Sequence, residues 1–185
     1  NGTEPWKETS ATGPLSVYGQ TKLEGDQAIA QSGCEHLIFR TSWVYSARGN
    51  NFMKTMLRLA QSKPALNIVA DQIGAPTPAR LIAQITAMAI QSNIPNGLYH
   101  LAPRGEASWH GFAQEIFRQA IERGEQLAMG PSNAHPIPTS DYPTPAQRPL
   151  NSRMALNKLE AALNIQLPTW KDQLQLTLTE YLEKN

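Results

Sequence analysis

The 185-residue sequence predicts an α/β fold that is rich in helix. Two observations favour it: short apolar segments alternate with longer helical ones, and hydrophobic residues make up 41% of the chain, which is enough for a packed core. A third observation limits the class, because neither a G-x-G-x-x-G loop nor a Walker glycine loop occurs in the sequence. We therefore expect about three strands and about five or six helices, without the phosphate-binding half of a dinucleotide-binding fold.

The beginning of the chain changes from loop to helix to strand. Residues 1–14 are rich in Gly, Pro, Ser and Thr and predict a loop. Residues 16–32 contain no proline and predict a helix, which Gly33 would end. The apolar segment 36–39 is typical of a buried strand in a parallel sheet. Polar side chains follow it within 40–45, and the carboxyl end of such a strand is where α/β proteins bind ligands.

The middle of the chain continues this alternation. Residues 51–61 and 80–91 have apolar residues at helical spacing and predict helices. Residues 66–70 and 97–101 are short, apolar and typical of strands. A further helix is expected over 108–123, with a serine as its cap and a glycine after its end.

The last third of the chain begins with a segment rich in proline. Six prolines lie within 131–152, so this segment is expected to be mostly irregular. Helices are predicted over 154–163 and 169–183, and the second of these starts with a capping box formed by Thr169 and Asp172. The apolar stripe of this last helix consists of Trp170, Leu174, Leu178, Tyr181 and Leu182.

Composition excludes several classes of protein. Lys plus Arg number 16 and Asp plus Glu 15, and this balance argues against a nucleic-acid partner, which needs a strongly basic face. No apolar segment reaches the ~20 residues of a membrane helix, so no membrane partner is expected. The single cysteine, Cys34, excludes an internal disulfide, and no metal site is readable. The chain opens at Asn1 without a methionine or a signal peptide, so we expect a cytoplasmic protein and a fragment of a longer chain.

A Tyr-x-x-x-Lys motif on the first predicted helix carries the clearest chemistry. Tyr18 and Lys22 are four residues apart, which places the phenol and the ammonium on one helix face. A free tyrosine has a pKa of about 10 and is a reluctant acid near neutral pH, whereas a nearby cation favours the phenolate. Such a tyrosine can protonate an alkoxide as hydride reaches a carbonyl carbon. From the spacing alone, the alternative is an ordinary exposed pair on a helix surface.

Six further segments, taken in order, are informative together. They are PLSVYGQTKLEG (14–25), HLIFRTSWVY (36–45), GNNFMKTMLRLA (49–60), DQIGAPT (71–77), GLYHLA (97–102) and YPTPAQRPLNS (142–152). With these segments the chain resembles, over essentially its whole length, the dTDP-4-dehydrorhamnose reductase family of extended short-chain dehydrogenases/reductases.

The resemblance implies the carboxyl-terminal part of a Rossmann-type reductase that lacks the amino-terminal dinucleotide-binding half. Residues 1–48 would remain from the Rossmann-type domain, and 49–185 would form mainly the substrate-binding region, with some segments returning to the Rossmann-type sheet. The helix 16–32 and strand 36–40 would then expose apolar surface where the missing sheet belongs, and the isolated chain would be inactive.

The implied reaction is reduction of the nucleotide sugar dTDP-4-dehydro-6-deoxy-L-mannose to dTDP-L-rhamnose by NADPH, with NADH left open as the cofactor. Some members of the family form a homodimer bridged by acidic residues and Mg²⁺. Arg80 stands where one of these acids would align, so neither Mg²⁺ nor the dimer that it bridges is supported in this sequence, and a homodimer of this chain is left open. Two alternatives remain open: a non-catalytic reductase-like subunit that binds a partner protein, and a related nucleotide-sugar reductase or epimerase.

The resemblance also assigns catalytic and cofactor-binding residues. Tyr18 would be the general acid, and Lys22 would favour its ionised form and bond the nicotinamide ribose. Thr41 and Ser42, which follow the first strand, would lie near the nicotinamide.

Five further residues would contact the substrate by the same resemblance. Trp43 would pack against the sugar, although a tryptophan at a strand end is also a common core residue. Asn50, Asn51 and Phe52 would lie along the diphosphate and base, and the two asparagines could equally form a turn and a helix cap. Arg148 would contact the diphosphate through its guanidinium fork, with a solvated loop charge as its alternative.

Three other polar residues have structural interpretations. Asp71 and Gln72 are expected to form a turn in which their side chains bond local backbone. His100, within an apolar strand, is expected to be a hydrogen-bonded core residue rather than a ligand.

Overall fold

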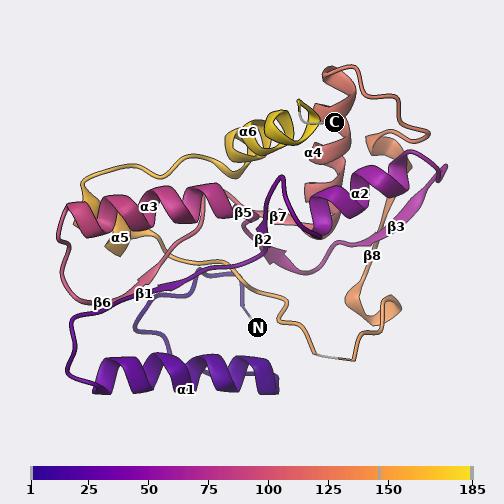
Figure 1. Cartoon of the computed structure of the whole chain (residues 1–185). Helices are drawn as coiled ribbons and strands as arrows, with labels where there is room; N and C mark the ends of the chain where they lie inside the picture. The colour runs from indigo at the N-terminus through magenta and orange to yellow at the C-terminus, as the bar shows by residue number, and fades with distance from the viewer. Residues whose placement is uncertain (1, 146, 184–185) are drawn as a thin grey trace.

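The computed structural model describes residues 2–145 and 147–183. These residues form six α-helices, eight short strands and two 3-10 helices (Figure 1). The helices are α1 (Val17–Gln31), α2 (Phe52–Ala60), α3 (Ala79–Gln91), α4 (Trp109–Glu122), α5 (Asn157–Leu163) and α6 (Trp170–Leu182), with 3-10 helices η1 (Pro131–Asn133) and η2 (Thr139–Asp141). The strands are β1 (Leu37–Arg40), β2 (Val44–Tyr45), β3 (Leu66–Val69), β4 (Ile73–Gly74), β5 (Thr77–Pro78), β6 (Gly97–His100), β7 (Ala107–Ser108) and β8 (Ala134–Ile137).

The strands associate as four two-stranded pairs among the described residues. β1 pairs with β6, β2 with β5 and β3 with β8, all in parallel, whereas β4 pairs with β7 in antiparallel orientation. The α/β class is confirmed, and the expectation of about three strands is wrong. Four of the strands contain only two residues, which is too short for a hydrophobic period to be recognised in the sequence.

The proline-rich segment 131–152 is less irregular than predicted, because it contains β8. The strand tolerates Pro136 since it pairs on one side only, with β3, and only alternate N–H groups of a strand face a given neighbour. The predicted helix over 154–163 begins later, at Asn157. Met154 forms a parallel bridge with Trp6, and the backbone N–H of Ala155 donates to the Trp6 carbonyl over 2.8 Å, so these residues are held extended.

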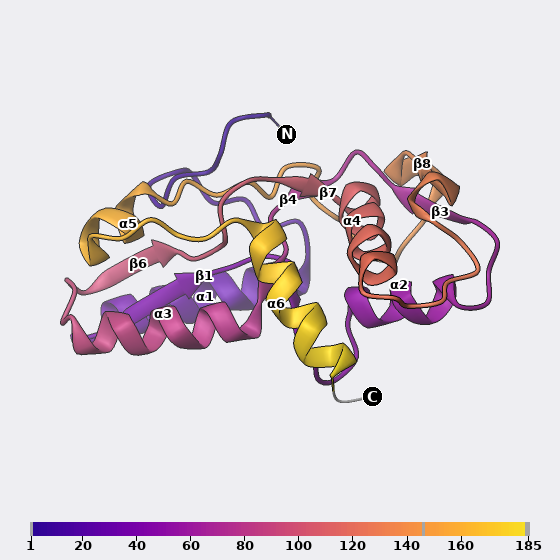
Figure 2. The ribbon, with the colours of Figure 1, turned by 90° about the horizontal axis from the view of Figure 1, so that it is seen from above.

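Two hydrophobic clusters form the core. The larger cluster joins α2, α4 and α6, and the smaller joins α3, β6 and α5. In Figures 1 and 2 the two groups of elements lie side by side, with α6 close to their junction. Helix α4 contributes seven buried residues and is the central element of the larger cluster.

Helix α1 differs from the other α-helices because it has no buried residue. It lies along β1 at one edge of the molecule (Figures 1 and 2), and an ion pair of 2.9 Å between Asp26 and Arg40 connects the two elements. Leu15, Val17 and Ile29 are exposed on this helix and just before it. The expected exposure of apolar side chains is therefore found on the helix, whereas the residues of β1 are half-buried.

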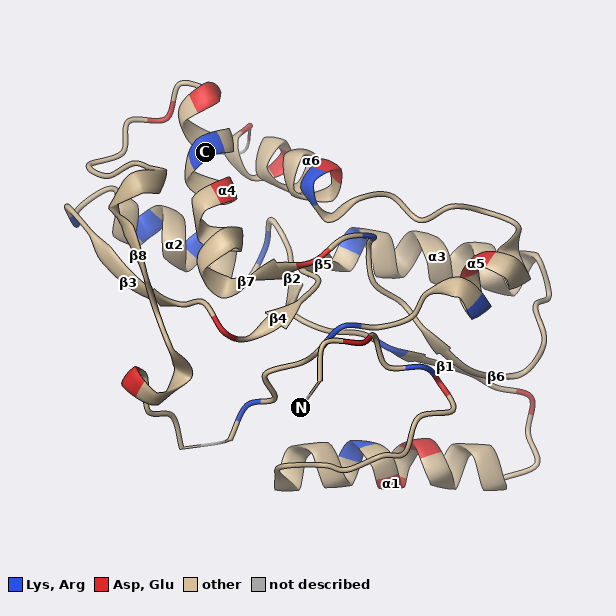
Figure 3. Cartoon of the chain, turned by 180° about the vertical axis from the view of Figure 1, so that it is seen from behind, with Lys and Arg blue, Asp and Glu red and all other residues tan. Residues whose placement is uncertain are grey.

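Charged residues of both signs are interspersed over the helices and loops (Figure 3). This distribution agrees with the near balance of 16 basic and 15 acidic residues. Within the described part of the chain, the longest apolar helices fall short of what a bilayer crossing requires.

Candidate functional site

Helix α1 presents Tyr18 and Lys22 together. The helix begins at Val17 because the Ser16 hydroxyl accepts a hydrogen bond of 3.2 Å from the Gly19 backbone N–H, which caps the first turn. One turn further, the Lys22 Nζ lies 5.6 Å from the centroid of the Tyr18 ring. Tyr18 is 72% exposed, so a ligand can reach its hydroxyl.

The carboxyl end of β1 places Thr41 and Ser42. Because α1 and β1 run in opposite directions side by side (Figure 1), the beginning of α1 and the end of β1 lie at the same end of this region. Ser42 donates a hydrogen bond of 3.2 Å to the Ala75 carbonyl. The Thr41 hydroxyl is buried and has no hydrogen-bond partner among the described residues. A buried hydroxyl without a partner is costly, which makes Thr41 the residue here with unused hydrogen-bonding capacity.

Trp43 lies in an aromatic cluster with Trp109 and Phe52. Its ring stacks on the Trp109 ring with centroids 3.8 Å apart and an angle of 13° between the planes. The Phe52 ring lies 4.7 Å from the Trp109 ring, in a tilted arrangement. Trp43 also adopts a left-handed backbone with φ of 50°, which is unusual for a bulky residue and is typical of functional sites. The structure thus brings two predicted substrate residues, Trp43 and Phe52, into contact with the same tryptophan, Trp109, which the sequence analysis did not select.

The prediction of local bonds holds only for Asp71, whose carboxylate accepts from its own backbone N–H; its other partners, and those of Gln72, are distant in sequence. The Asp71 carboxylate accepts hydrogen bonds from the Thr139 backbone N–H at 2.9 Å and from its hydroxyl at 2.6 Å. Burial opposes ionisation of Asp71, but the hydrogen bonds from Thr139 prevail and lower its pKa. Gln72 is buried and donates to the Thr139 hydroxyl over 3.1 Å. The parallel pairing of β3 with β8 brings these residues together, although they are distant in sequence.

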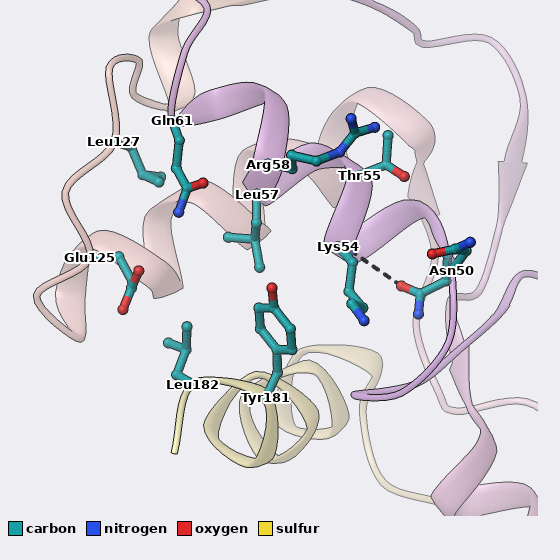
Figure 4. Close-up of a pocket in the computed structure, with 11 residues that line it drawn as sticks. Asn50, Lys54, Thr55, Leu57, Arg58, Gln61, Glu125, Leu127, Tyr181 and Leu182 are labelled. Atoms are coloured by element: carbon teal, nitrogen blue, oxygen red, sulfur yellow. Dashed lines mark hydrogen bonds between the residues drawn. The ribbon is translucent and has the colours of Figure 1, made fainter. Parts of the chain in front are cut away.

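Asn51 caps α2 and also lines a cavity. Its side chain accepts from the Lys54 N–H over 3.3 Å and donates to the Ser46 carbonyl over 2.8 Å, so the predicted cap is present. Asn50 and Asn51 form one end of a cavity of about 880 Å³ between α2 and the end of α6 (Figure 4). The cavity is polar at α2, where Lys54 and Arg58 lie, and Tyr181 closes it from α6. The asparagines and Phe52 therefore contribute to two different places, because Phe52 packs in the aromatic cluster.

Two remaining residues of the sequence analysis lie elsewhere. Arg148 is exposed in the segment that follows η2. His100 is buried at the end of β6 as expected, but its Nδ1 has no hydrogen-bond partner among the described residues, so it is not fully satisfied. Burial is the main cause that lowers the pKa of His100; the nearby Glu8 carboxylate opposes this effect and Arg40 reinforces it.

The described residues contain no group of three His, Cys, Asp or Glu side chains that could hold a metal ion. Arg80, at the position discussed for Mg²⁺, forms an ion pair with Glu180 of α6.

Comparison with known proteins gives consistent matches over nearly the whole chain. The family model described as the RmlD substrate binding domain matches residues 1–183. The chain is 48% identical over 184 residues to a dTDP-4-dehydrorhamnose reductase of Shigella flexneri, and 49% identical over 183 residues to that of Salmonella typhimurium. Each alignment covers 97% of this chain but only 61% and 60% of the respective relative, so the chain spans about 60% of their length.

A solved structure also matches this chain. It is a dTDP-4-dehydrorhamnose reductase from Bacillus anthracis in complex with NADP, which is 32% identical and superposes with a TM-score of 0.83. The match covers 96% of this chain and 59% of that structure.

Proposed function

The chain belongs to the RmlD substrate binding domain family, and from this premise we propose that it forms part of a dTDP-4-dehydrorhamnose reductase. The proposed reaction is the reduction of the C4 ketone of dTDP-4-dehydro-6-deoxy-L-mannose to give dTDP-L-rhamnose. The observation that carries the proposal is the pairing of Tyr18 and Lys22 on an accessible helix face, 5.6 Å from Nζ to ring centroid. The high identity to relatives that carry this name supports the choice of substrate.

In this proposal Tyr18 acts as the general acid. As the ketone carbon accepts hydride, the carbonyl π bond breaks and its electron pair moves to oxygen, which takes the proton of the Tyr18 hydroxyl. The Lys22 ammonium stabilises the phenolate that remains on Tyr18 by direct Coulomb attraction. The proton balance is completed when the phenolate is reprotonated from solvent.

NADPH fits this site as the cofactor, and when bound it supplies the hydride. Lys22 would bond its ribose, and Thr41 and Ser42 would hold the nicotinamide end. The support for this assignment is the buried Thr41 hydroxyl, which has no partner among the described residues at the carboxyl end of β1 and can bond a cofactor amide. The Bacillus anthracis relative was solved with NADP.

The substrate would lie along residues from three other segments. Trp43 and Phe52 are half-buried, and the parts of their rings that the stacking on Trp109 and Phe112 leaves accessible would contact the sugar and the base. Asn50 and Asn51 would contact the diphosphate at the beginning of α2, where the helix dipole favours an anion. Arg148 would supply a guanidinium to the same diphosphate.

Activity can be tested by joining this chain to the amino-terminal part of the Salmonella typhimurium relative and measuring NADPH oxidation with the dehydro sugar. We expect Tyr18→Phe to lower kcat by at least about 100-fold, because general acid catalysis contributes about 10²–10⁴-fold. Tyr142→Phe is the matched control, since Tyr142 is also an exposed tyrosine and has no assigned role. A folded Tyr18→Phe protein with normal turnover would reject Tyr18 as the acid.

The chain by itself gives a second test, by fluorescence titration with NADPH. We expect no saturable binding, because the sequence has no glycine loop for the cofactor phosphates. Tight binding by the 185-residue chain would mean that the cofactor site lies elsewhere. A folded fusion protein that binds NADPH but never turns over the sugar would favour the alternative of a non-catalytic subunit.

A further inference from the structure

The pairing of β4 with β7 determines which side chain meets the Trp109 indole. Ile73 is opposite Ser108 in this antiparallel pair, so the residue before Ile73 faces the residue after Ser108. These residues are Gln72 and Trp109, and the Trp109 Nε1 donates a hydrogen bond of 3.1 Å to the Gln72 Oε1. Gln72 is only 8% exposed, so water does not compete readily for this bond.

Both ends of the Gln72 amide are constrained by the chemistry of their partners. The Thr139 hydroxyl gives its proton to Asp71 over 2.6 Å, so toward Gln72 it can only accept. It accepts from the Gln72 Nε2 over 3.1 Å. An indole N–H can only donate, so the other end of the amide must be the oxygen. A carboxylate at this position would have no donor for Thr139. An apolar side chain would have neither that donor nor an acceptor for the Trp109 N–H.

The orientation of Trp109 is passed on to Trp43 by packing. The two indoles stack with centroids 3.8 Å apart. On the Gly74 side there is no spare room, because a Cβ added there would lie 3.0 Å from the Trp43 Cε2. The Trp43 ring therefore lies between Trp109 and Gly74 of β4. A rotation of Trp109 would therefore displace the Trp43 ring.

We propose that Gln72 is a positioning residue, which holds Trp109 through its amide oxygen and thereby sets the Trp43 ring against the sugar of the substrate. The inference rests on the proposed function only where it takes Trp43 as the sugar contact. Asp71 and Thr139 support Gln72 from the other end, so the network connects the sugar contact to η2.

The stacking can be measured on the 185-residue chain without any ligand. Two stacked indoles give an exciton couplet in the far-ultraviolet circular dichroism spectrum, and Trp43→Phe identifies the part that comes from this pair. We expect Gln72→Leu to reduce that couplet at least about twofold, since the Trp109 indole N–H loses its buried acceptor and the ring reorients. Gln173→Leu is the matched control, because Gln173 is a buried glutamine of α6.

A variant at Thr139 keeps the test decisive if the Gln72 variant folds poorly. Thr139→Val removes the hydroxyl that accepts from Gln72 and should weaken the couplet, whereas Thr139→Ser keeps the hydroxyl and should restore it. A full couplet in folded Gln72→Leu, or equal spectra for Thr139→Val and wild type, would overturn the inference.

Kinetics of the fusion enzyme separate a positioning role from a general loss of structure. In Gln72→Leu we expect the KM for the dehydro sugar nucleotide to rise about tenfold, with an unchanged inhibition constant for dTDP, which lacks the hexose. Equal weakening of both ligands would overturn the sugar-positioning role. If the unsubstituted fusion enzyme does not reduce the sugar at all, the proposed function fails, and the couplet still decides whether Gln72 orients the tryptophans.

Discussion

Helices α1 and α4 have similar lengths and similar N-terminal caps, but they differ in how many of their residues are buried. They contain 15 and 14 residues, and each begins with a serine whose hydroxyl accepts from the backbone N–H three residues later. Yet α4 buries seven residues and α1 buries none. Caps and helix propensity are therefore enough to define a helix, but only tertiary contacts decide how much it contributes to stability.

The proposed catalytic residues and the residues that hold the proposed sugar contact lie on these two different helices. Tyr18 and Lys22 lie on the helix without a buried face, whereas Trp109 opens the helix that organises the larger core. The proposed acid is thus accessible, and the proposed sugar contact is held by the core. We expect changes in α4 to affect the whole fold and changes in α1 to remain local.

The largest expected effect is in the core of α4. Phe112 is fully buried and its ring contacts Tyr45, Phe52 and Trp170 at centroid distances of 5.3, 5.5 and 6.0 Å. Phe112→Ala should lower the free energy of unfolding by about 3–5 kcal/mol, because it removes apolar contacts and leaves a cavity. Urea unfolding measures this change.

The control for Phe112→Ala is a truncation on the other helix. Val17 is 81% exposed, and Val17→Ala should change the free energy of unfolding by less than about 0.5 kcal/mol. Equal losses in the two variants would show that α1 packs as tightly as α4, and would contradict the comparison.

The caps give an effect of intermediate size. Ser108→Ala should cost about 1 kcal/mol of global stability, because its hydroxyl caps α4 over 2.9 Å. Ser16→Ala removes the same kind of bond from α1, and we expect it to speed amide hydrogen exchange in α1 without changing the global unfolding transition. A global loss in Ser16→Ala would mean that α1 unfolds together with the core.

The smallest expected effect concerns the stability of the fold at acidic pH. Burial opposes ionisation of Glu115 in α4, but hydrogen bonds from Arg118 and Gln119 and the Arg118 charge prevail, so its pKa is lowered. A carboxyl with a lowered pKa stabilises the fold above its unfolded pKa, and this contribution is lost as pH falls through the folded value.

Glu115→Gln should therefore make the melting temperature less dependent on pH below about pH 4.3, the ordinary pKa of a glutamate. The matched variant on the other helix is Glu24→Gln, at an exposed position of α1. An unchanged slope in Glu115→Gln would show that its ion pair does not contribute to stability.

Local patterns in the sequence predicted most of the helices closely. Helices expected over 16–32 and 80–91 are observed at Val17–Gln31 and Ala79–Gln91. Helical spacing, serine caps and terminal glycines act within one or two turns, so a linear sequence contains them in full. The same holds for Tyr18 and Lys22, whose approach follows from a spacing of four residues on one helix.

Contacts between distant segments decided the remainder. The strand β8 exists because β3 lies beside it, and α5 begins late because residues 154–155 pair with Trp6. Gln72 looked like a turn residue because its partners, Trp109 and Thr139, are 37 and 67 residues away. The sequence by itself determined the helices, their caps and the Tyr18–Lys22 pair, since these depend on short-range geometry. The tertiary structure alone decided the strand pairs, the burial of each helix and the network around Trp43, because each requires a partner that only folding brings near.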